Sequence, residues 1–93
     1  MSGYTSKIPN IDISVTIDNN AYFRIEVMRV GINIGHIQMF HYWDTEPGTW
    51  DVHSWGREGF EGKVKNLYSE TISNKSRQEM LDIALTYFEN HLP

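Results

Sequence analysis

The fold is decided first by residues 11–30, IDISVTIDNNAYFRIEVMRV. Apolar side chains occupy every second position within residues 11–17 and again within 23–27. A period of two places these side chains on one face of a β-strand and the polar ones on the other. Asn19-Asn20 between the two runs favours a tight turn, because Asn tolerates positive φ. The stretch therefore predicts an antiparallel hairpin with one buried face.

Further strands are expected along the chain, at about residues 34–43 and 49–55. Between them, Glu46-Pro47-Gly48-Thr49 favours a type II turn, in which Pro presets φ and Gly supplies a positive φ. Residues 56–63 carry three Gly and several charges, and we interpret them as a flexible loop. Residues 64–72 fit either a short fifth strand or an irregular segment.

The C-terminal segment carries a helical pattern. Apolar side chains recur at spacings of three and four from Met80 to Phe88. Ser76 and Glu79 fit a capping box at its start, and the helix should end by about Asn90. A wide apolar stripe must be buried, and the apolar face of the sheet is its large partner. The predicted fold is α+β: an antiparallel four- to five-stranded β-meander with one C-terminal α-helix packed across one face.

Length and composition limit the classes of protein. The 93 residues suit one domain, assigned to residues 10–93 and preceded by a flexible N-terminal arm, residues 1–9. The chain has no Cys and a net charge of −4, which argues against a disulfide scaffold, a Cys-based zinc module, a thiol enzyme and a strongly basic nucleic-acid binder. With no secretory signal or long apolar run, we expect a cytoplasmic protein without membrane association or direct nucleic-acid binding.

Aromatic residues are concentrated around the third and fourth strands. Six of the 12 aromatic residues, including all three Trp, fall within residues 40–60. Alternation sorts this hairpin into two faces. One face carries Met39, His41, Trp43, Trp50, Val52 and Ser54, and the other carries Phe40, Tyr42, Asp44, Asp51, His53 and Trp55. If Pro47 and Gly48 form the centre of the hairpin, Phe40 pairs with Trp55.

No motif for catalysis or for cofactor binding is present, since HExxH, GxSxG, GxGxxG and the phosphate-binding loop are all absent. We therefore expect no enzymatic activity, no cofactor and no bound metal. The leading hypothesis is a small protein-binding domain that occludes a site on a protein partner, with a homodimer as a further expectation for so small a core. Trp, Tyr and Arg dominate binding hot spots. The candidate partner-binding residues are Tyr42, Asp44, Trp50, Asp51, Trp55, Arg57, Glu58 and Phe60.

The expected layout, a small antiparallel sheet closed by one helix, resembles that of many compact inhibitors, immunity proteins and phage-encoded anti-defence proteins. This resemblance concerns architecture alone, and it implies an inhibitory or anti-defence role. Two other hypotheses stay open. The first is a small-ligand or carbohydrate-binding module that uses the aromatic hairpin 40–60. The second is a metal-dependent or acid/base enzyme that uses His41, Asp44, Asp51 and His53.

Overall fold

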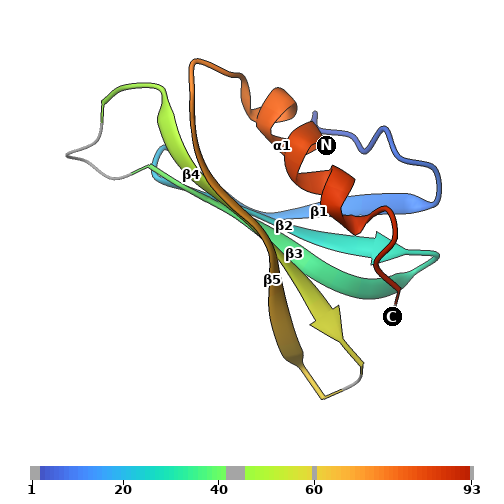
Figure 1. The fold of residues 1–93 in the computed structure, drawn as a ribbon. Helices are drawn as coiled ribbons and strands as arrows, with labels where there is room; N and C mark the ends of the chain where they lie inside the picture. Colours follow the sequence, from blue (N-terminus) through green and yellow to red (C-terminus); the bar gives the residue numbers. More distant parts are fainter. Residues whose placement is uncertain (1–2, 42–45, 60, 93) are drawn as a thin grey trace.

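The computed structural model describes residues 3–41, 46–59 and 61–92. Five antiparallel strands form one open sheet in which each strand lies beside the next along the chain (Figure 1). The predicted meander is confirmed, and residues 64–72 belong to a fifth strand. The strands are β1 (Ile11–Asp18), β2 (Tyr22–Arg29), β3 (Ile32–Phe40), β4 (Thr49–Glu58) and β5 (Lys63–Ser73).

A two-residue turn joins β2 to β3. Val30 and Gly31 have φ angles of 49° and 80°. Positive φ at both central residues is the geometry of a type I′ turn, whose twist matches that of the flanking strands. Because this turn is so short, β3 begins at Ile32, two residues earlier than the sequence predicted.

The predicted C-terminal helix is present as α1 (Arg77–Leu85), which continues into the 3₁₀ turn η1 (Thr86–Phe88). Its N-terminus has the predicted capping box. Ser76 Oγ accepts a hydrogen bond from the Glu79 N–H at 3.1 Å, and the Ser76 N–H donates to the Glu79 carboxylate at 3.0 Å. On the inner side, the buried Ser54 hydroxyl donates to the carbonyl of Ala84 at 2.9 Å. This bond ties the middle of β4 to the helix.

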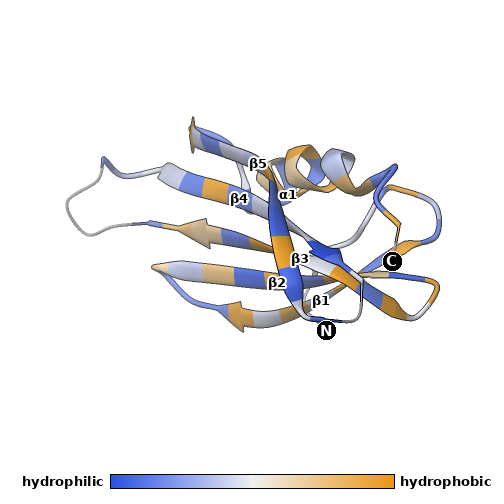
Figure 2. Cartoon of the chain, turned by 60° about the horizontal axis from the view of Figure 1, so that its bottom comes forward, coloured by the Kyte–Doolittle hydropathy of each residue, from blue (hydrophilic) through white to orange (hydrophobic). Residues whose placement is uncertain are grey.

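The hydrophobic core lies between α1 and one face of the sheet. Figure 2 shows hydrophobic and hydrophilic bands alternating along the strands, as expected for a sheet with one buried face. Strand β5 contributes only partly buried side chains, because it lies at the edge of the sheet. The buried apolar residues are Ile11, Phe23, Ile25, Val27, Ile34, Ile37, Met39, Val52, Met80, Leu81, Ala84, Leu85 and Phe88.

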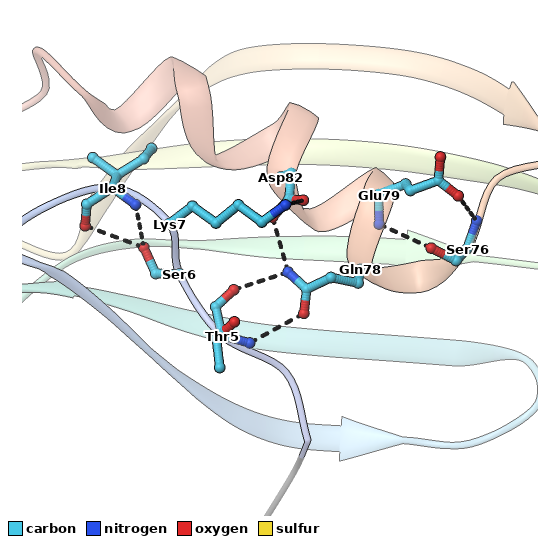
Figure 3. Close-up of polar contacts among 8 residues, drawn as sticks. All are labelled: Thr5, Ser6, Lys7, Ile8, Ser76, Gln78, Glu79 and Asp82. Atoms are coloured by element: carbon cyan, nitrogen blue, oxygen red, sulfur yellow. Dashed lines mark hydrogen bonds and ion pairs between the residues drawn. The ribbon is translucent and has the colours of Figure 1, made fainter.

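The segment before β1 lies along the helix (Figure 3). The Thr5 N–H donates to Gln78 Oε1 at 3.1 Å, and Gln78 Nε2 donates to the Thr5 carbonyl at 2.9 Å. Lys7 Nζ lies 3.1 Å from a carboxylate oxygen of Asp82. The described part of the segment that we expected to be a flexible arm therefore makes defined polar contacts with α1.

The register of the hairpin formed by β3 and β4 differs from the prediction. Phe40 pairs with Asp51 rather than with Trp55, a displacement of four residues. The predicted turn at residues 46–49 is present, with the Thr49 N–H donating to the Glu46 carbonyl at 3.1 Å, but it forms only the end of a longer connection. Side chains alternate between the two faces of a strand, so a displacement by an even number of residues leaves each described side chain on its predicted face. Met39, Val52 and Ser54 are buried under α1, whereas Phe40, Asp51, His53 and Trp55 lie on the other face.

Strand β4 is also longer than predicted. The interpretation of residues 56–63 as a flexible loop is wrong for residues 56–58, which belong to β4, and for Lys63, which begins β5. Gly56 is buried, and a Cβ there would lie 2.8 Å from both the His91 ring and the Leu67 side chain. The His91 ring is held in place by its Nε2–H, which donates to the Arg57 carbonyl at 2.7 Å. Gly56 therefore allows a close approach of the C-terminal segment instead of marking a loop.

Candidate binding surface on the open face of the sheet

No described element covers the face of the sheet opposite α1, because the segment before β1 lies on the same side of the sheet as α1 (Figure 1). We call this uncovered side the open face. Along β2, β3 and β4, the side chains that point to this open face alternate with those that enter the core. They are mostly half-buried, since neighbouring side chains on the same face cover one another. The open face therefore presents a packed surface to its surroundings.

Five rings form an aromatic band across the three central strands. Tyr22 stacks on Phe40, with ring centroids 4.7 Å apart and planes at 15°. Phe40 lies 6.2 Å from His53, and His53 lies 6.4 Å from Trp55. Trp55 in turn lies 6.4 Å from His36. The band follows from strand pairing, since Tyr22 is the direct neighbour of Phe40 and His36 is that of Trp55.

Hydrogen bonds fix two of these rings and leave a third with an unused donor. Gln38 Nε2 donates to the Tyr22 hydroxyl at 2.9 Å. His53 Nδ1 is hydrogen-bonded to the hydroxyl of Ser69 on β5. The indole Nε1 of Trp55 is buried and has no acceptor among the described residues. A buried donor without a partner typically costs about 1–3 kcal/mol.

Charged groups border the band. Arg24 Nε lies 3.1 Å from a carboxylate oxygen of Glu26, in an ion pair whose side chains are 32% and 27% exposed. Burial and the positive charge of Arg24 lower the pKa of His36 below its ordinary value of 6.5, although Glu26 acts in the opposite direction. The lowered pKa favours the neutral form of the His36 ring. Within the described chain, the Arg57 guanidinium has no hydrogen bond or ion pair.

The structure brings together three of the candidate residues chosen from the sequence. Asp51, Trp55 and Arg57 alternate along β4 and share the open face. Asp51 accepts a hydrogen bond from the Thr71 hydroxyl at 2.8 Å. Glu58 is exposed at the last position of β4. The remaining candidates Tyr42, Asp44 and Phe60 lie outside the described residues.

Trp50, by contrast, belongs to the helix side. Its half-buried ring packs against the core, and the Arg77 guanidinium lies 4.8 Å from its centroid. The same guanidinium lies 4.8 Å from the ring of Phe23, so it is shared by two aromatic faces. Trp50 and Trp55 therefore face opposite sides of the sheet, and we do not include Trp50 in the candidate surface.

Sequence reasoning missed the part of the surface that comes from β2 and β3. His36, which is half-buried and stacks on Trp55, was not among the candidate residues. Tyr22, Arg24 and Gln38 were not singled out either. Their alternation with buried neighbours was visible in the sequence, but only the register shows that they adjoin Trp55.

The residues of the metal or acid/base hypothesis are divided between the two faces. His41 lies on the side of Trp50, with ring centroids 5.2 Å apart, and its Nδ1 donates to the Thr49 carbonyl at 2.9 Å. His53 lies in the aromatic band on the opposite face. Across residues 3–41, 46–59 and 61–92, no three His, Asp or Glu side chains gather in a way that would hold a metal ion.

Comparisons with models of protein families, with curated proteins and with solved structures found no match. Among the residues that the structure describes, no helix is long and apolar enough to cross a membrane. The functional interpretation of this chain therefore rests on the geometry of the open face.

Proposed function

We propose that this protein is a non-enzymatic binding protein whose open face docks on a protein partner and inhibits the partner by covering the contacted site. The observation that carries the proposal is the aromatic band, defined above by Tyr22, Phe40, His53, Trp55 and His36, on a face that no described element covers. Aromatic side chains give large, rigid contacts with a polar tip, which is why they are enriched in binding hot spots.

The arrangement of polar groups supports a protein partner. Typical protein interfaces have an apolar, aromatic centre and a polar rim. Here the rings lie on the central strands, and Asp51, Arg57 and the pair of Arg24 with Glu26 lie around them. The indole ring of Trp55 lies at the centre of this arrangement. A partner that covers the band would gain contact area from its rings.

Stacking of nucleic-acid bases is the competing use of an aromatic sheet face. Such surfaces need cations that follow the phosphate backbone. Arg24 is already compensated by Glu26, and the whole chain has a net charge of −4. These charges favour a protein partner over a nucleic acid.

The test is quantitative capture from a lysate of the source organism with immobilised wild type and variants. Trp55→Ala and Arg57→Ala alter the open face, whereas Tyr87→Ala removes an aromatic ring that is 46% exposed and lies on the helix side. We expect one protein to be retained by wild type and by Tyr87→Ala, and to be lost at least tenfold from both open-face variants, which corresponds to about 1.4 kcal/mol or more.

Three outcomes would contradict the proposal. One is equal retention by the open-face variants and by the Tyr87 control. Another is loss of retention that tracks loss of thermal stability in every open-face variant. The third is binding of a single-stranded oligonucleotide that depends on Trp55, as fluorescence anisotropy would detect. Light scattering of the purified chain would show whether the partner is a second copy.

A further inference from the structure

A hollow of about 400 Å³ lies beside the aromatic band, where β2, β3, β4 and the start of β5 meet. Its wall includes Arg24, Glu26, Asn33, His36, Arg57 and Val64. This hollow is distinct from the band itself, although it shares His36 with it. Arg24, Glu26 and Arg57 of its wall also border the proposed docking surface.

Two β-bulges lie in the strands that surround the hollow. The register of β2 and β3 shifts between Val27 and Met28, and the register of β4 and β5 shifts between Ser54 and Trp55. A bulge increases the local twist and redirects neighbouring side chains, and bulges are frequent next to functional sites. Gly35, which lies beside the first bulge on β3, adds no side chain to the wall. The irregular strands thus leave a recess in an otherwise packed face.

The polar wall contains one positive charge without compensation. The Glu26 carboxylate is already engaged through both oxygens: Arg24 Nε lies 3.1 Å from one, and Asn33 Nδ2 donates to the other at 3.2 Å. The Arg57 guanidinium has no hydrogen bond or ion pair in the part of the chain that is described. The His36 ring also has no hydrogen-bond partner there, so one of its nitrogens is available as a donor.

We propose that this hollow binds a carboxylate carried on an aromatic or apolar body. The carboxylate would pair with Arg57, whose planar guanidinium matches a carboxylate in two parallel hydrogen bonds. The body would lie against Val64, the direct neighbour of Arg57 on β5, whose side chain is 46% exposed. A recess of this volume holds far more than a carboxylate alone, which is why the ligand needs a body.

The charges of the wall favour an anion. Arg24 and Arg57 outnumber the single carboxylate of Glu26 in the wall, so a carboxylate is attracted there more strongly than a neutral group of the same shape. The proposal goes beyond protein docking by the open face and does not depend on it.

The experiment is a titration followed by ¹H–¹⁵N NMR, with benzoate, benzamide and phenyl phosphate as probes. The three probes share a ring and differ in charge. The readouts are the side-chain Nε–H of Arg57 and the indole N–H of Trp55, the neighbour of His36. The variants are Arg57→Gln, which removes the uncompensated charge, and Lys75→Gln, which removes an exposed charge outside the hollow.

We expect benzoate to shift these signals saturably, and benzamide to bind at least tenfold more weakly. Arg57→Gln should weaken benzoate binding at least tenfold, whereas Lys75→Gln should leave it unchanged. Equal binding of benzoate and benzamide, or unchanged binding by Arg57→Gln in a protein with a preserved spectrum, would overturn the proposal. Tighter binding of phenyl phosphate than of benzoate would overturn the preference for a carboxylate.

Discussion

The imidazole of His36 stacks on the indole of Trp55, with ring centroids 6.4 Å apart and planes at 22°. The two residues are direct neighbours on β3 and β4. Their contact joins the aromatic band to the hollow beside it, because His36 belongs to both. A register displaced by two residues in either direction would separate them, so the continuity of the open face depends on the pairing of these two strands.

The two described Trp residues should differ in their effect on stability. Trp50→Ala removes a ring that packs against the core and against Arg77, so we expect the free energy of unfolding to fall by about 2–3 kcal/mol. Trp55→Ala should cost only about 1 kcal/mol, because the open face lies outside the core and the lost indole had an unused donor. Chemical denaturation measures both. Equal destabilisation by the two substitutions would show that Trp55 supports the fold as much as Trp50 does, and would argue against a Trp55 ring that serves binding instead.

Gly35 should tolerate no side chain. A Cβ there would lie 2.0 Å from the Trp55 carbonyl oxygen and 2.7 Å from the Phe88 ring, and its φ is 149°. We therefore expect Gly35→Ala to destabilise the fold by about 3 kcal/mol, because β3 and β4 must move apart. Gly31 is the control. Its φ is 80° with open space around it, so Gly31→Ala should cost only about 1 kcal/mol. Similar melting temperatures for the two variants would contradict this prediction.

The protonation of His36 should make stability depend on pH. Burial, together with the positive charge of Arg24, lowers its pKa below 6.5 in the folded protein, against the effect of Glu26. Below about pH 6.5 the unfolded chain therefore binds more protons at this position than the folded one, and the free energy of unfolding decreases as the pH falls. His36→Gln should make this decrease shallower between about pH 7 and pH 5. An unchanged slope in urea denaturation would show that His36 does not contribute.

Ser54 should contribute more to the free energy of unfolding than a serine on the surface does. Its hydroxyl is fully buried and donates to the Ala84 carbonyl at 2.9 Å, which links β4 to α1. Ser54→Ala should lower the free energy of unfolding by about 1–2 kcal/mol, because it removes a buried hydrogen bond. Ser14→Ala, at an exposed position of β1, is the control and should change it by less than about 0.5 kcal/mol. Thermal unfolding compares the two, and an equal shift would contradict the proposed tie between sheet and helix.

Much of the fold could be predicted from local patterns. The alternation of apolar and polar residues around Ile13 and Ile25 predicted the first two strands. The pair of Ser76 and Glu79 predicted the start of the helix. The candidate surface was harder to predict. Of the open-face residues on β4, the sequence singled out Asp51, Trp55 and Arg57, but not their neighbours on β2 and β3. The pairing of Phe40 with Asp51 depends on the length of the connection between β3 and β4. The turn at residues 46–49 is predicted as the centre of that connection but lies at its end.

The sequence by itself determined which side chains face which side of each strand and which stripe of the helix is apolar. These properties follow from the fixed periods of strand and helix, so an error of four residues in register left the faces unchanged. Only the tertiary structure decided which side chains became neighbours across strands. The bulges beside Trp55 and Gly35, and the long link between β3 and β4, brought His36 to Trp55 and left Arg57 without a partner in the described chain. Contacts between distant segments depend on the summed geometry of turns and bulges, which no local period encodes.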